Sequence, residues 1–178
     1  MRKWKKVLVW LAYVGIAGWW GFGWRGWEFL VGNIIALGLG LVDRLLYVWW
    51  LYPFEQSSIQ VQYWTRRRDL KAVIGLLLGG TANQHKLIFR SLGFAFVWVM
   101  LAVYVMSSTG SIVAMGMVMG LGFDLVWSIL NDWKLPGKLG TWLCWQIKRP
   151  VTEREVRWYA GTFVAIWGIF LLQLMWGR

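Results

Sequence analysis

Long apolar stretches constrain the fold of this chain more than any other feature of its sequence. Five are present, at residues 7–24, 27–52, 87–106, 112–130 and 158–176. About 20 mostly apolar residues are enough for a helix to cross a bilayer, and a helix satisfies its own backbone hydrogen bonds in lipid. The sequence therefore predicts an all-α fold, a polytopic transmembrane helical bundle of about five spans, with residues 1–178 forming a single integral membrane domain.

The basic residues are distributed unevenly between the spans. Sixteen of the 19 Lys and Arg residues lie in the N-terminal tail, between residues 66 and 90, or between residues 134 and 157. Five spans put all three regions on one side of the membrane, whereas a four-span arrangement would remove this asymmetry. Because basic loops mark the cytoplasmic side, we expect a cell inner membrane protein with a cytoplasmic N-terminus and an outside C-terminus.

Short interfacial helices are expected in the two cytoplasmic loops, residues 53–86 and 131–157. Residues 72–78 form an apolar run too short to span, preceded by a basic flank of Arg66, Arg67, Arg68 and Lys71. This combination is typical of a segment at an anionic membrane surface, so the four residues are candidate ligands of lipid headgroups. The neighbouring Tyr63 and Trp64 also fit nucleic-acid binding. Arginines beside membrane spans more often set topology, and no nucleic-acid partner is expected.

Other loop residues carry local signals. Residues 58–63 alternate as a strand would, but a lone short strand is marginal, and we expect irregular structure. Pro136-Gly137 predicts a turn, and residues 139–147 predict a surface helix. Thr152 and Glu155 have the spacing of a capping box that opens the last span. Thr81 and Gln84 have the same spacing and predict a helix that runs from residue 81 into the third span.

The second span contains the adjacent charged residues Asp43 and Arg44. If one helix covers residues 27–52, this pair lies within the bilayer. If the helix ends near Val42, the pair marks the interface and residues 45–52 lie along the surface. The sequence fits both arrangements. Ionisable groups in a span face protein or water and are functional candidates, so Asp43 and Arg44 form a candidate intramembrane pair.

A stripe of small and polar residues runs along the fourth span. Its members are four residues apart, on one slowly drifting face of a helix: Gly116, Gly120, Asp124, Ser128 and Asp132. The two glycines predict close packing of a neighbouring helix. A turn at residues 107–111 makes spans three and four an antiparallel hairpin. Arg90 then lies level with Ser128, within reach of Asp124 or Asp132, and Lys86 shares its face.

These positions predict a buried polar cluster of Arg90, Asp124, Ser128, Asp132 and Lys86. Its simplest interpretation is interhelical ion pairing, which compensates buried charge and fixes the register of the hairpin. A second interpretation is a functional pocket for proton transfer, ion passage or substrate binding. In a third, Asp132 only caps the end of its helix in water.

Residues suited to catalysis or metal binding are scarce. His85 is the single histidine, and Ser128 and Asp132 are the only candidates level with it. The single cysteine, Cys144, excludes an internal disulfide and a multi-cysteine metal site. We therefore expect no catalytic residue, no metal and no other cofactor.

The sequence favours a small membrane protein that acts as a non-enzymatic accessory, assembly or scaffold subunit. Its expected partners are anionic lipid headgroups and either another protein or further copies of the chain. The first alternative is a transporter or proton- or ion-conducting protein that uses an Arg90/Asp124 pocket. The second alternative is a membrane-embedded hydrolase that uses His85 with Asp132.

Overall fold

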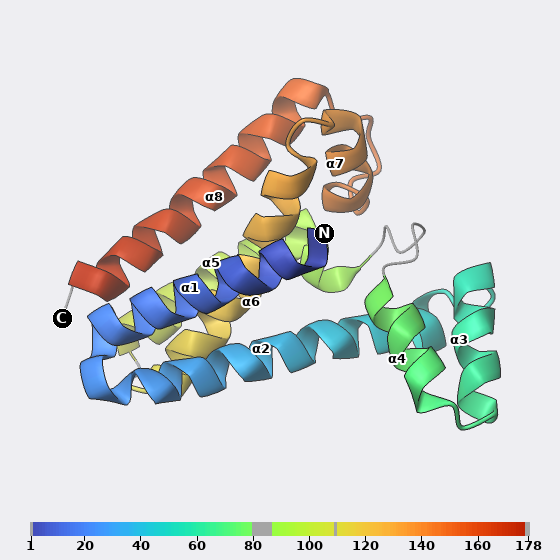
Figure 1. Ribbon diagram of the computed structural model, residues 1–178. Coiled ribbons are helices and arrows are strands. Elements are labelled where there is room, and N and C mark those ends of the chain that lie inside the picture. The colour runs from blue at the N-terminus through green and yellow to red at the C-terminus, as the bar shows by residue number, and fades with distance from the viewer. Residues whose placement is uncertain (1, 80–86, 109, 177–178) are drawn as a thin grey trace.

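Helices make up the regular structure of the computed structural model, which describes residues 2–79, 87–108 and 110–176 (Figure 1). Its α-helices are α1 (Arg2–Phe22), α2 (Gly26–Leu46), α3 (Gln56–Arg66), α4 (Leu70–Gly79), α5 (Leu92–Ser108), α6 (Ile112–Asp132), α7 (Pro136–Leu143) and α8 (Glu153–Trp176). No strand occurs in these three segments. The predicted all-α class is confirmed.

Three helical stretches of the described residues are long and apolar enough to cross a membrane. They are Trp4–Leu51, Ile112–Asp132 and Glu153–Trp176, and the apolar helix α5 is shorter. The first stretch folds back on itself, because a 3-10 turn at Gly23–Arg25 returns α2 alongside α1 (Figure 1). Gly23 has a φ of +53°, a backbone conformation that favours glycine. The lengths and composition of these helices are those of an integral membrane protein.

The contact between α2 and α6 brings two backbones together. A Cβ atom on Gly32 of α2 would lie 2.1 Å from the carbonyl oxygen of Val113. In the reverse direction, a Cβ atom on Gly116 of α6 would lie 2.3 Å from the carbonyl oxygen of Phe29. Both distances are far below van der Waals contact, so only glycine fits at either position.

Trp98 joins three helices on the other side of α6. Its side chain is fully buried, and its Nε1 donates to the carbonyl oxygen of Val118 at 2.7 Å. Its ring meets Phe163 and Phe170 of α8 edge to face. The hydrogen bond satisfies the polar atom of a large apolar group, and α5, α6 and α8 therefore pack around one side chain.

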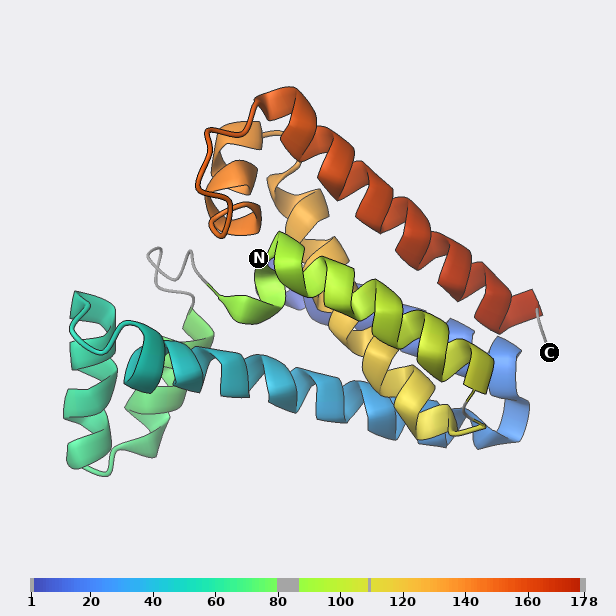
Figure 2. The same ribbon diagram turned by 180° about the vertical axis from the view of Figure 1, so that it is seen from behind.

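A smaller unit lies at the far end of α2, away from the rest of the bundle (Figures 1 and 2). There α2 continues as a π-helix, Tyr47–Leu51, and α3 and α4 form a hairpin beside it. The unit has its own apolar core of Tyr47, Val48, Val61, Val73, Leu77 and Leu87. The helix runs on through Asp43 and Arg44, so it does not end near Val42. The depth of this pair in the membrane stays a prediction.

The prediction of irregular structure at residues 58–63 is wrong, since these residues belong to α3. The buried positions of α3 are Ser57, Ser58 and Val61, which are spaced as on one face of a helix. Over so short a stretch the helical and strand periods overlap. The packing of α3 against Tyr47 and Val48 decides between them.

The prediction of a continuous helix through residues 87–91 is also wrong. Leu87 and Ser91 are extended, and a short 3-10 turn, Ile88–Arg90, lies between them. Ser91 begins α5 as its N-cap, because its Oγ accepts the backbone N–H of Phe94 at 3.1 Å. The predicted capping box at Thr81–Gln84 lies outside the described residues.

Of the predictions for the second loop, residues 131–157, one is confirmed and one is wrong. Glu155 donates its N–H to Thr152 Oγ1 at 3.3 Å, and Thr152 donates its N–H to Glu155 Oε2 at 2.9 Å, which is the predicted capping box. Pro136 does not make a turn but opens α7, where its missing N–H costs nothing. Helix α7 is not merely a surface helix, since Leu139 and Leu143 are buried.

Candidate functional site

Asp124 of α6 lies between two cations. Arg90 donates to its Oδ2, from Nη2 at 3.1 Å and from Nε at 3.4 Å. The Nζ of Lys6 on α1 donates to its Oδ1. The side chains of all three residues are 28–30% exposed. The carboxylate of Asp124 thus links α1 and the turn before α5 to α6. The three side chains are partly exposed to the surroundings of the protein.

Asp43 of α2 positions the turn that carries Arg90. Its two carboxylate oxygens accept the backbone N–H groups of Ile88, at 3.1 Å, and of Phe89, at 2.9 Å. These donors open the 3-10 turn and have no partner within it, so a carboxylate both satisfies and attracts them. Asp43 is 2% exposed. Its charge is therefore compensated by backbone groups in a buried position.

Arg44, the next residue of α2, bonds to a different segment. Its Nη1 donates to the carbonyl oxygen of Leu77 near the end of α4. Arg44 also lies within electrostatic range of Arg90 and Asp124. Two adjacent residues of α2 therefore hold the end of α4 and the beginning of the segment that leads into α5.

We name Lys6, Asp43, Arg44, Arg90 and Asp124 together the charged centre. It joins α1, α2, α6 and the 3-10 turn, and it has three basic and two acidic groups. The ion pairs of Asp124 with Lys6 and Arg90 offset the cost of removing these charges from water. The bonds of Asp43 and Arg44 to backbone groups do the same for the other two members. A carboxylate engaged in this way is not poised to act as a general base.

Ser128 and Asp132 lie outside the charged centre. Ser128 donates from Oγ to the carbonyl oxygen of Asp124, one turn back, at 2.8 Å. Asp132 accepts from Lys138 Nζ at 2.9 Å and from Trp142 Nε1 at 3.2 Å, which fastens α7 to the end of α6. Grouping Asp132 with Arg90 is therefore a wrong prediction, because α7 supplies nearer partners.

Two further predicted residues, Lys86 and His85, lie outside the described residues. The pairing expected for Lys86 and the hydrolase role considered for His85 stay predictions.

Gly120 packs against α2 one turn beyond Gly116. A Cβ atom there would lie 2.8 Å from both the Cβ of Ala36 and the Oδ1 of Asn33. Asn33 is fully buried, and its Nδ2 donates to the carbonyl oxygen of Phe29 at 3.0 Å. The two glycines predicted as a packing face both lie at the contact between α2 and α6.

The basic flank occupies the turn between α3 and α4. Arg66, Arg67 and Arg68 are exposed there, and Lys71 follows in the first turn of α4. Arg67 lies over the ring of Tyr63, with its Cζ 4.6 Å from the ring centre. Figure 1 shows this turn pointing away from the bundle, where it is accessible to lipid or to a partner.

Sequence reasoning missed three polar contacts to α6. Lys6 was counted only as part of a basic tail, and nothing in the sequence shows which helix α1 packs against. Trp98 and Trp167 donate from Nε1 to the carbonyl oxygens of Val118, at 2.7 Å, and Met119, at 3.3 Å. Their position in the middle of apolar stretches, away from the interfaces where tryptophan is enriched, was an available signal.

Neither a metal centre nor a reactive thiol is evident in the part of the chain that the structure describes. No group of three or more His, Cys, Asp or Glu residues there could hold a metal ion. Cys144 is buried, and burial raises the pKa of its thiol, with a further contribution from the charge of Glu155. A raised pKa disfavours the nucleophilic thiolate at neutral pH.

Comparisons with protein-family models, with curated proteins and with solved structures gave no match to this chain. The charged centre and the exposed surfaces are therefore the basis for a functional proposal.

Proposed function

We propose that this chain is a small integral membrane protein that acts as a non-enzymatic accessory, assembly or scaffold subunit. One observation carries the proposal: Asp124 is already bonded to both Lys6 and Arg90. A carboxylate with two cationic partners compensates buried charge and fixes helix positions. The charged centre is thus used in holding four segments together, which is a structural task.

The proposal includes a cell inner membrane location with five spans, α1, α2, α5, α6 and α8, and a cytoplasmic N-terminus. Helices α1 and α2 have 21 residues each, enough to cross separately, and α5 has 17, the lower limit for a span. In this topology the charged centre, α7 and the α3–α4 hairpin fall on the cytoplasmic side. The basic residues then obey the positive-inside rule.

The α3–α4 hairpin is the surface that we assign to a partner. Its turn presents Arg66, Arg67 and Arg68, and the same unit exposes the apolar side chains of Phe54 and Leu70, at 91% and 68%. Exposed apolar residues beside a basic turn suit an acidic protein surface or anionic headgroups. The helices of the bundle, by contrast, supply the anchor.

Purification in mild detergent, followed by quantitative mass spectrometry, tests the accessory role. We expect another protein, or a second copy of the chain, in a fixed ratio to it. The triple variant Arg66→Gln/Arg67→Gln/Arg68→Gln should lower this ratio several-fold. A control variant, Lys5→Gln/Lys134→Gln/Lys148→Gln, removes the same charge from exposed positions outside the hairpin and should retain the partner. A monodisperse single chain in every preparation would contradict the proposal.

A transport or proton-conducting role is the second candidate. The partial exposure of Lys6, Arg90 and Asp124, at 28–30%, favours it, since an ion pair with an open edge can admit water. Flux into liposomes would then be lost in Asp124→Asn at unchanged thermal stability. If Asp124→Asn instead lowers the melting temperature and leaves flux unchanged, the accessory role is the better account.

A further inference from the structure

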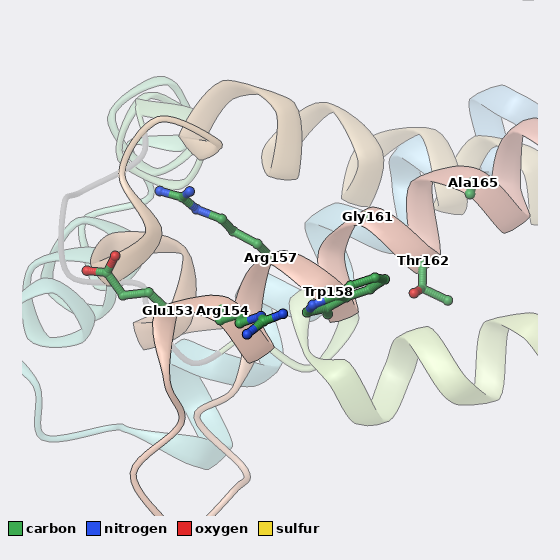
Figure 3. Close-up of a pocket in the computed structure, with 7 residues that line it drawn as sticks. All are labelled: Glu153, Arg154, Arg157, Trp158, Gly161, Thr162 and Ala165. Carbon is green, nitrogen blue, oxygen red and sulfur yellow. The ribbon is translucent and has the colours of Figure 1, made fainter.

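A groove separate from the charged centre lies along the beginning of α8 (Figure 3). It has a volume of about 690 Å³ and is lined by one face of the helix. The residues that define it recur every three or four positions, the spacing of neighbours on a helix surface: Arg154, Arg157, Trp158, Gly161, Thr162 and Ala165.

The chemistry of the groove changes along its length. At the beginning of α8 it has the exposed side chains of Arg154, Arg157 and Trp158, and Figure 3 shows the two arginines extending in different directions from the helix. One turn further on, the lining includes the small residues Gly161 and Ala165, and a Cβ atom on Gly161 would lie 3.6 Å from the ring of Trp133. A cationic, aromatic end is thus continuous with a narrow strip of small residues.

The two arginines of the groove, Arg154 and Arg157, have no carboxylate partner among the described residues. The nearby carboxylate of Glu155 is bonded to Arg149 at 2.8 Å. Glu153 also lines the groove, so its two cations outnumber its one acid. The net charge of the lining is positive and favours an anionic occupant.

We propose that this groove binds one anionic phospholipid. The phosphate lies at the cationic end of the groove, beside Arg154, whose planar guanidinium group suits phosphate oxygens, and the charge of Arg157 adds to the attraction. Trp158, 67% exposed, lies at the level of the glycerol backbone, where indole rings are enriched. One acyl chain runs over Gly161 and Ala165 towards the bilayer centre. The proposal requires that α8 cross the membrane, but it is independent of the accessory role.

Native mass spectrometry of the full chain in detergent micelles, titrated with phosphatidylglycerol, tests the proposal. Wild type should bind one phosphatidylglycerol molecule in preference to phosphatidylcholine. Arg154→Gln/Arg157→Gln should weaken that binding roughly thirtyfold, given the energy of two cations near an anionic headgroup. The matched control, Lys134→Gln/Lys148→Gln, removes two exposed charges from the preceding loop and should keep the wild-type affinity within about twofold.

A second variant tests the shape of the groove with its charges intact. Ala165→Trp places a large ring in the groove at an exposed position, so the fold should persist with an unchanged melting temperature. We expect the same loss of phosphatidylglycerol as in the arginine variant. Equal losses in the arginine and lysine variants, or equal binding of phosphatidylcholine, would overturn the proposal. So would a dimer that dissociates in Ala165→Trp, which would make the face a protein interface.

Discussion

The two ends of α2 hold the protein together by different means. Near Gly32 the helix packs closely against α6. The carbonyl oxygen of Val113 fills the space that a side chain at Gly32 would need. Near Asp43 and Arg44 it makes directional bonds to the end of α4 and to the turn before α5. The packing at the first end requires glycine, which has no side chain. The bonds at the second end require the charged groups of Asp43 and Arg44. They should therefore fail under different substitutions.

The largest effect should follow from filling the glycine contact. In Gly116→Leu the new side chain would begin 2.3 Å from the carbonyl oxygen of Phe29, a backbone atom that moves only with its helix. We expect a loss of about 3 kcal/mol or more in stability, seen as a lower melting temperature in detergent. Gly38→Leu is the control, because nothing lies within 4 Å of that position. Equal melting temperatures for the two variants would refute the shape-only account of this contact.

Removing the central carboxylate should have the next largest effect. Asp124→Asn removes the carboxylate that pairs with both Lys6 and Arg90, at a cost of about 2 kcal/mol once the partial exposure of these side chains is allowed for. Lys6→Met in the same chain removes one uncompensated cation and should recover part of this stability. Thermal unfolding of the two single variants and the double variant measures the coupling. Strict additivity would mean that the pair contributes nothing.

Asp43→Asn tests whether the bonds at one end of α2 can be weakened without affecting the packing at the other end. It keeps the size of the side chain but replaces the charged acceptor of two backbone N–H groups, which should cost about 1.5 kcal/mol. Hydrogen exchange followed by mass spectrometry should show faster exchange over residues 87–91 and no change around Gly32. Faster exchange at both places would show that the two ends act as one cooperative unit.

The smallest effect concerns the unit beyond the charged centre. The hydroxyl of Tyr47 donates to Glu55 just before α3, so Tyr47→Phe should cost about 1 kcal/mol. Faster hydrogen exchange at the beginning of α3 is the expected signature. Tyr104→Phe, at a position that is 62% exposed on α5, serves as the control. Unchanged exchange in α3 would mean that its apolar core alone holds it in place.

Sequence reasoning succeeded where residue spacing along a helix, or within one hairpin, determines which side chains lie close together. The four-residue spacing put Gly116, Gly120 and Asp124 on related faces of α6, and hairpin geometry brought Arg90 within reach of Asp124. It failed where the choice of partner depends on how helices assemble. Lys6 lies 118 residues from Asp124, and no local pattern shows that α1 packs beside α6. For Asp132, the local turn into α7 supplied partners that a straight-hairpin argument ignores.

Secondary structure in the loops was predicted poorly for a related reason. Residues 58–63 fit two periods, and only contact with Tyr47 and Val48 selects the helical one. The break at Ser91 was hidden within an apolar run. It is stabilised by Asp43 from a distant helix and by the hydroxyl of Ser91 itself. Local propensity is a weak guide where tertiary bonds supply the deciding energy.

The bonds of Asp43 have a consequence for biosynthesis. Its backbone donor at Ile88 lies 45 residues later in the chain. At roughly 5–20 residues per second, the ribosome needs about 2–9 s to make that stretch. During this interval α2 has been synthesised, but its carboxylate has no native partner. The contact between α2 and the turn before α5 can therefore form only after residues 88 and 89 have been synthesised, so this part of the fold is completed late.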